Sequence, residues 1–335
     1  MSMHTTIRQA GIRQIQPAGI KRLWTAPFIL AVLAVTALGV LSIFTGVYDI
    51  RGQEDGLAMI FITRVPRTAS LMLTGAAMSM AGLVMQLITQ NRMVEPTTTG
   101  TIEWAGFGLL LVYLFSPNPT LLVRMGGAII FSFAGTMAFF LLLRRVRLRS
   151  SLIVPIIGMM LGAVISALST FLGLAFNMTQ NISNWFIGSF SAVQTGRYEY
   201  LWLIIPLTIA IFLYADRLTL AGLGSDIATS LGVSYSRIVL TGTALISLTV
   251  GIVTAVIGSL PFLGLIVPNI VSRFRGDDLK HNLPWVCLLG MGTITLCDIL
   301  SRVIIMPFEV PVSLILGTFG SLVFILLLLG QRRHQ

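Results

Sequence analysis

The sequence predicts an all-α, polytopic membrane protein with ten transmembrane helices, and three observations lead to this prediction. Only 10% of the 335 residues are charged, whereas about a quarter are charged in ordinary soluble chains. Apolar residues make up 55% of the chain, and the mean hydropathy is +0.91. These apolar residues gather in runs of about twenty, which is the length that an α-helix needs to cross a bilayer.

The spans follow one another along a single transmembrane domain, residues 1–335. We expect them at about 24–45, 68–88, 97–115, 120–143, 152–176, 199–215, 238–257, 262–272, 283–305 and 312–329. The eighth is the shortest because Pro261 and Pro268 interrupt it. The first follows a basic leader, 1–23, and lacks a small-residue cleavage site, so it is a retained span rather than a signal peptide.

The basic residues set the orientation of the spans. With the leader in the cytoplasm, sixteen of the 22 Lys and Arg residues lie in cytoplasmic segments, in accordance with the positive-inside rule. The other six are Arg51, Arg64, Arg67, Arg124, Arg197 and Arg302. An even number of spans then places both termini in the cytoplasm. Because the basic residues form short loop clusters and no basic domain, no nucleic-acid partner is expected.

A faint internal echo supports an inverted repeat. The segment LMLTGAAMS (71–79) on the second span resembles IVLTGTALIS (238–247) on the seventh. The two spans are five apart and therefore cross the membrane in opposite directions, as an inverted repeat requires. Chance recurrence is the alternative, since small residues are common where membrane helices pack closely.

No enzyme motif or Cys-His cluster occurs, so the sequence predicts neither an enzyme nor a chain with a cofactor or metal of its own. The spans also lack an array of carboxylates, which disfavours an ion-coupled secondary transporter. Two acids do lie in apolar stretches. Asp298 has a helical partner in Arg302, four residues on, so a structural ion pair is expected over a functional role. Glu103 is expected to reach the interface by snorkelling.

The segment RVPRT carries two arginines at the outer end of the second span, against the charge bias. Arg64 and Arg67 fit either an interfacial anchor or a docking surface for an acidic partner outside the membrane, with Arg302 joining that surface.

The cytoplasmic loop 217–237 predicts a short amphipathic helix. Asp226 suits a helix start and Gly232 a helix end. Ile227, Ala228 and Leu231 share one side, and Gly224 precedes the helix. Because the helix contains no basic residue, binding to a soluble partner is favoured over adsorption to the membrane.

Taken together, these segments resemble the BtuC/FecCD family of ABC-transporter permeases. The resemblance rests on RVPRTASLMLTGAAMSMAGLVMQ, GLGSDIATSLGV, GSLPFLGLIVPNIVSRF, and CDILSR followed by EVPVSLILGTFGSLVFILLL. These segments occur in the family's order between residues 64 and 329.

The resemblance implies a membrane permease of a bacterial ATP-driven importer for ferric siderophores, with vitamin B12 or haem as alternative substrates. It implies an inverted pair formed by spans two to five and seven to ten. The partners would be two ATPase subunits, a second permease subunit (a heterodimer over a homodimer) and a periplasmic or lipid-anchored binding protein. The ATPases would supply the ATP chemistry and drive alternating access in the cytoplasmic membrane.

The resemblance also assigns residues. Arg64, Arg67 and Arg302 match positions that dock the binding protein, and the loop helix 226–231 matches the coupling helix. Asn91 and Met93 match gate positions, with Ser150 and Ser151 as a second gate. Two residues depart from the family pattern, Arg92 and Asn269. The form VPNIVSRFRGDD looks closest to the branch for catecholate-type siderophores such as petrobactin and vibriobactin.

Overall fold

The computed structural model describes residues 25–46, 56–146, 152–276 and 279–331, and all regular secondary structure within them is helical. The longer helices are α1 (Ala26–Phe44), α3 (Val65–Thr89), α4 (Thr101–Phe115), α5 (Leu121–Arg145), α6 (Ile153–Ala175), α8 (Ile204–Leu213), α11 (Tyr235–Val256), α12 (Leu263–Arg275), α13 (Leu279–Val303) and α14 (Val312–Gln331). Shorter ones are α2 (Gly56–Met59), the π-helix η2 (Ile60–Arg64), α7 (Thr179–Phe186), the 3₁₀ helix η3 (Tyr198–Leu203), α9 (Ala215–Gly222) and α10 (Ser225–Ser230).

Each of the ten predicted spans coincides with one of these helical segments. Six helices of the described residues are long and apolar enough to cross a membrane, and η3–α8 with α9 adds a seventh that is bent by 59°. The remaining three predicted spans are the helices α4, α12 and α14. Sequence reasoning missed α7, whose Thr, Gln, Asn and Ser residues interrupt the apolar pattern.

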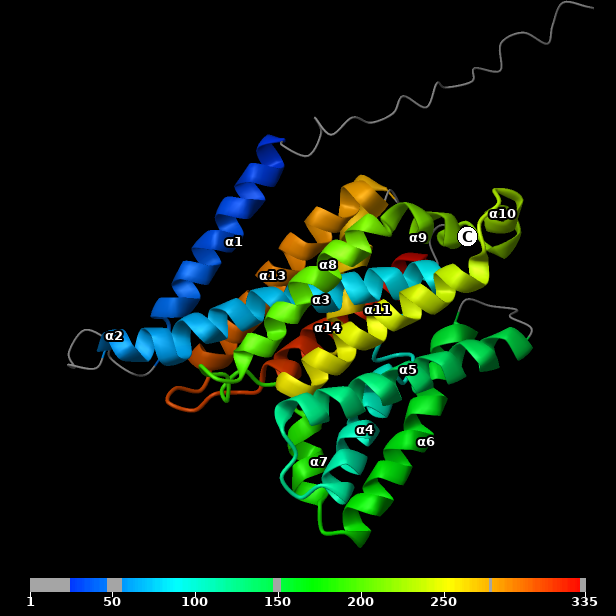
Figure 1. Ribbon diagram of the computed structural model, residues 1–335. Coiled ribbons are helices and arrows are strands. Elements are labelled where there is room, and N and C mark those ends of the chain that lie inside the picture. Colours follow the sequence, from blue (N-terminus) through cyan, green and yellow to red (C-terminus); the bar gives the residue numbers. More distant parts are fainter. Residues whose placement is uncertain (1–24, 47–55, 147–151, 277–278, 332–335) are drawn as a thin grey trace, which may run out of the picture.

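Helices α3 and α11 cross at the centre of the molecule, and each packs on the outer helices of one half (Figure 1). In one half α11 packs on α5 and α4, and in the other α3 packs on α13 and α12. The central helix of each group, α3 of α3–α6 and α11 of α11–α14, thus packs on outer helices of the other group. Helix α2 lies at one end of α3, and α9 and α10 lie near its other end, so we refer to the α2 face and the α10 face of the molecule.

Glycines bring α3 into backbone contact with the other half. A Cβ atom on Gly82 would lie 2.0 Å from the carbonyl oxygen of Gly264 on α12. A Cβ atom on Gly75 would lie 2.6 Å from that of Gly290 on α13. Both distances are far below van der Waals contact, so only glycine permits these crossings, as in other closely packed membrane helices.

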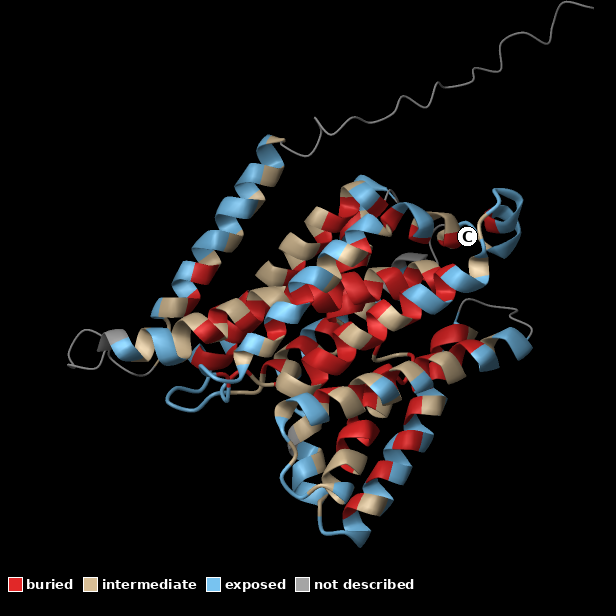
Figure 2. Ribbon diagram, in the orientation of Figure 1, coloured by how far each residue is buried: buried red, intermediate tan, exposed pale blue. Residues whose placement is uncertain are grey.

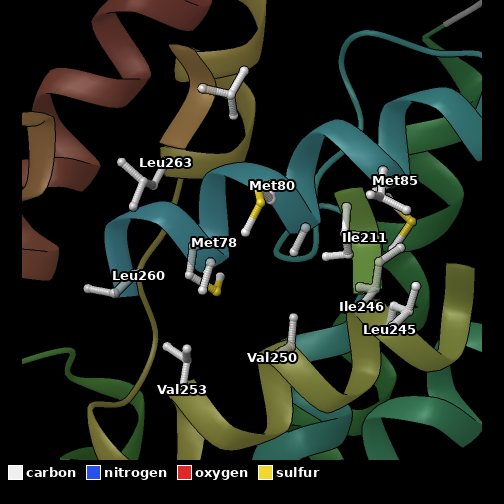
Figure 3. Close-up of a cluster of buried hydrophobic side chains, with 14 of the residues drawn as sticks. Met78, Met80, Met85, Ile211, Leu245, Ile246, Val250, Val253, Leu260 and Leu263 are labelled. Atoms are coloured by element: carbon white, nitrogen blue, oxygen red, sulfur yellow. The ribbon is translucent and has the colours of Figure 1, made fainter. Parts of the chain in front are cut away.

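The interior is apolar but the outside is apolar too. Met78, Met85, Leu245, Val250 and other side chains fill the space between α3 and α11 (Figure 3). Exposed residues nevertheless dominate α1 and much of α6 (Figure 2), and many are large hydrophobics such as Leu30, Leu33, Met160 and Val164. Lipid-facing helices have this surface because hydrocarbon replaces water as their solvent.

Helix α12 illustrates how a broken span satisfies its polar groups. Proline at 268 has no N–H for the carbonyl oxygen of Gly264, four residues earlier. Gln86 of α3 donates to that oxygen instead, at 3.2 Å from its Nε2. A neighbouring helix therefore completes the hydrogen bonding, which is how membrane helices tolerate proline.

Candidate functional site

An ion network joins α3 and α13 near the α2 face. Asp298 on α13 is fully buried and lies between two guanidinium groups. Its Oδ1 is 2.7 Å from Nη2 of Arg67, and its Oδ2 is 2.6 Å from Nη2 of Arg302. The predicted helical pair of Asp298 with Arg302 is confirmed. The second partner, Arg67, is 231 positions away in sequence and only the tertiary structure reveals it.

Arg302 also fixes the end of α1. Its Nη1 donates to the carbonyl oxygens of Ser42 and Thr45 at 2.9 and 2.7 Å, and its Nη2 donates to the Ser42 hydroxyl at 2.7 Å. The residue is 2% exposed. The expectation that Arg302 joins an outer docking surface is therefore not supported by its position, because its donors are used inside the protein.

Arg64 and Arg67 do line a common pocket of about 260 Å³ on the α2 face. Arg67 is largely buried and binds both carboxylate oxygens of Glu309 at 3.0 Å. Arg64 is half-buried and donates to the carbonyl oxygen of Thr45. Among the described residues Arg64 has no carboxylate within ion-pair distance, so it is the more available of the two for an acidic partner.

Helix α10 presents apolar side chains on the opposite face. Ile227 and Leu231 are 48% and 58% exposed, whereas Ala228 is fully buried, so the expectation that all three share one side is wrong for Ala228. Asp226 lies in the first turn, after Gly224 with a φ of +107°. Gly232, with a φ of +77°, ends the helix. Its N–H donates to the carbonyl oxygen of Thr229, and the N–H of Val233 donates to the carbonyl oxygen of Ala228. This is a Schellman motif, and it fixes the direction in which Ile227 and Leu231 project.

The predicted gate residues are divided between described and undescribed segments. Asn91 and Met93 are 5% and 6% exposed, and the Asn91 Oδ1 accepts a hydrogen bond from the Met93 N–H at 2.9 Å. Both follow α3 on the α10 side. Ser150 and Ser151 lie outside the described residues.

The two residues that depart from the family pattern contact one another. The Asn269 side-chain amide donates to the carbonyl oxygen of Arg92 at 2.8 Å and to that of Leu265 at 2.7 Å. Arg92 thus belongs to a connection that is tied to α12, next to a cavity of about 280 Å³. The sequence marked both positions but not their contact.

The segment 90–100 also contains a carboxylate that sequence reasoning left unassigned. Glu95 is fully buried, and its Oε1 accepts hydrogen bonds from the Phe262 N–H at 2.8 Å and from the Thr97 hydroxyl. Phe262 immediately precedes α12 and has a φ of +64°. A carboxylate at a helix start is stabilised by the free N–H groups and the helix dipole. The only available signal was the position of Glu95 in the segment QNRMVEP.

Glu103 does not reach the interface as expected. Its carboxylate packs against α6, where a Cβ atom on Gly162 would lie 3.3 Å from its Oε2, and that oxygen is shielded from solvent without a hydrogen-bond partner. Snorkelling fails because α6 covers the side chain.

The match to known proteins extends along almost the whole chain. The model of the FecCD transport family matches residues 23–330. The chain belongs to the FecCD transport family. Within the family's curated proteins, it is 72% identical to the petrobactin import system permease protein FatD of Bacillus anthracis, over 98% of each chain. It is 41% identical to the petrobactin import system permease protein YclN of Bacillus subtilis strain 168, over 91% of this chain and 97% of the relative.

A solved structure has the same fold. It is described as a metal-chelate type ABC transporter in an inward-facing conformation, and it matches with a TM-score of 0.78 and 25% identity over 91% of this chain and 99% of its own. The predicted ten-helix permease fold is therefore confirmed. As a FecCD protein, this chain is a multi-span membrane permease and not an enzyme.

Proposed function

We propose that this chain is the permease subunit of an ATP-driven importer that carries a ferric siderophore, of the petrobactin type, across the bacterial cytoplasmic membrane. The single observation that carries the proposal is the 72% identity, over nearly the full length of both chains, to a petrobactin import permease. Vitamin B12 and haem are the alternative substrates within the same family.

The proposed complex contains two ATPase subunits, a second and different permease subunit, and a periplasmic or lipid-anchored siderophore-binding protein. The α2 face lies outside and the α10 face lies in the cytoplasm, together with both termini. This orientation agrees with the excess of Lys and Arg in the segments on the α10 side. The chain itself works as one transmembrane domain and needs no cofactor or resident metal.

Three sets of residues have proposed tasks. Ile227 of α10 and Leu231, which directly follows α10, enter a groove on an ATPase subunit, and their exposure supports this role. Arg64 binds an acidic side chain of the binding protein, supported by its position in the pocket on the α2 face. Asn91 and Met93, with Ser150 and Ser151, act as gates.

The transport mechanism is alternating access. ATP binding closes the ATPase subunits and moves α10, and α9 transmits that movement toward α3, on which it packs. The permease contributes no catalytic group. Its task is to form a path for a large cargo, and its contacts with the cargo must be weak enough to release it.

Reconstitution tests the proposal directly. The chain, its partner permease and the ATPase are placed in liposomes with the binding protein outside, and accumulation of ⁵⁵Fe-petrobactin is measured with ATP inside. We expect uptake that depends on ATP and on the binding protein. Accumulation of vitamin B12 or haem in place of ferric petrobactin would show that the proposed substrate is wrong. Uptake driven by an ion gradient without the ATPase would show that the chain is not part of an ATP-driven importer.

A further inference from the structure

Two cationic pockets lie on either side of one segment of the α2 face. The segment 187–197 connects α7 to η3, and Thr195 anchors it by donating its N–H to the carbonyl oxygen of Ile62 at 3.0 Å. Val193 in this segment lines the Arg64 pocket on one side. The same residue lines a smaller pocket of about 50 Å³ on the other side. The two pockets are therefore neighbours on one surface.

The smaller pocket, which we call the Arg124 pocket, is lined by Arg124 and Arg197. Arg124 is held in place: its Nη1 donates to the Tyr113 hydroxyl at 3.0 Å, and the Tyr113 ring stacks on Trp185 at 4.7 Å. Its Nε is shielded from solvent and has no hydrogen-bond partner. A buried donor without a partner is costly, so this atom favours an acceptor that arrives from elsewhere.

Arg197 supplies the second charge of the pocket. Its side chain is exposed and has neither a hydrogen bond nor an ion pair within the described part of the chain. The nearby carboxylate of Glu199 is used differently, since it accepts the Gly196 N–H at 2.7 Å. Leu121, the first residue of α5, also lines the pocket. The partial positive charge at the N-terminus of α5 thus adds to the charges of the two guanidinium groups.

We propose that the Arg124 pocket binds an Asp or Glu side chain of the extracytoplasmic binding protein, as a second docking point beside the Arg64 pocket. This inference rests on the proposed function. A carboxylate offers two acceptor oxygens, which match guanidinium donors in charge and geometry. Two separated contacts on one surface fix the rotation of a docked protein, which a single charge pair cannot do.

The test measures docking and not transport. The permease complex is placed in nanodiscs, and the Kd of the substrate-free binding protein is measured at low salt for the unmodified complex and for Arg197→Glu. Arg197 is the residue to change because its side chain has no internal bond to lose. Arg197→Lys keeps the charge, and Arg273→Glu makes the same reversal at an exposed site on the α10 face. We expect the Kd to rise about tenfold or more for Arg197→Glu and to stay near the original value for both controls.

Three results decide the matter. The proposal is supported if changing an acidic residue of the binding protein to Arg restores its affinity for the Arg197→Glu complex. An unchanged Kd for Arg197→Glu, with a weakened Kd for Arg64→Glu, overturns this inference and leaves the proposed function intact. If both variants bind as the unmodified complex does, the docking face of the proposed function fails as well.

Discussion

The carboxylate of Glu95 accepts a hydrogen bond from the backbone N–H of Phe262 at 2.8 Å, across 167 positions of sequence. Phe262 starts the short helix α12 in a left-handed conformation that few residues adopt. Glu95 therefore supplies from another segment the cap that the local sequence of α12 lacks. The connection after α3 and the start of α12 are joined at this point, so they are expected to move together during transport.

The first prediction concerns this cap and its pH dependence. Burial raises the pKa of Glu95 to about 7, although hydrogen bonds from Thr97 and Phe262 oppose the rise. The folded protein thus holds this proton more tightly than the unfolded chain does. The resulting stability is complete below pH 4.5 and is lost as the pH rises through about 7, with a magnitude on the order of 3 kcal/mol.

Two variants at position 95 separate the cap from the charge. Glu95→Gln keeps an acceptor and stays neutral, so its Tm relative to the unmodified protein should rise between pH 5.5 and pH 8. Glu95→Ala removes the acceptor and should cost about 0.5–2 kcal/mol even at pH 5.5. Thermal unfolding in nanodiscs measures both. A constant difference between the Gln variant and the unmodified protein across this range would show that Glu95 does not titrate there.

The second prediction concerns the buried ion network. Asp298→Ala leaves the guanidinium of Arg302 buried without its carboxylate, and we expect a loss of about 3–5 kcal/mol in the free energy of unfolding. Glu309→Ala is the matched control, because it removes the other carboxylate that binds Arg67. The side chain of Glu309 is 34% exposed. Its cost should be no more than about 1 kcal/mol. Equal losses for the two variants would contradict the assignment of Asp298 as the centre of the network.

The third prediction concerns the contact between α3 and α12. Gly82→Val places side-chain atoms where the backbone of Gly264 lies, so we expect little folded protein in the membrane fraction. Gly126→Ala on α5 meets no atom within 4 Å and should be neutral or stabilise by up to about 1 kcal/mol. Size-exclusion profiles of the two variants in detergent compare them. A normal profile for Gly82→Val would mean that α3 and α12 can separate without loss of the fold.

The fourth prediction concerns α10. Leu231→Asp replaces an exposed apolar side chain of the proposed ATPase contact by a charge, and should abolish the stimulation of ATP hydrolysis by the loaded binding protein. Ser236→Asp introduces the same charge at an exposed position of α11 and should leave the stimulation intact. Co-purification of the ATPase and its hydrolysis rate are the measurements. Full stimulation in the Leu231 variant would exclude this surface from coupling.

The fifth prediction concerns the contact between the two residues that depart from the family pattern. Asn269→Ala removes the donor to the carbonyl oxygen of Arg92. Because this hydrogen bond is exposed to solvent, the free energy of unfolding should fall by no more than about 1 kcal/mol. Asn269→Asp replaces that donor by an acceptor and should cost more, because two carbonyl oxygens would then face a carboxylate. Thermal unfolding distinguishes them. Identical Tm values for the two variants would show that the amide does not hold this connection.

The sequence by itself determined membrane residence, the ten spans and the family. These follow from composition, from the length of the apolar runs and from ordered motifs, all of which are local properties of the chain. It also located the helix of the loop 217–237, because Asp226 and Gly232 are local signals for a start and an end. The Asp298–Arg302 pair could be predicted for the same reason, since a spacing of four is fixed by helix geometry.

Only the tertiary structure decided which groups meet across the fold. Arg67 reaches Asp298, Glu95 caps α12, and Arg302 turns inward to the end of α1. A sequence records that an arginine stands at the end of a span, but its exposure depends on which helix packs against it. Arg302 has a structural role because the end of α1 covers it. Arg64 instead lines the pocket on the α2 face.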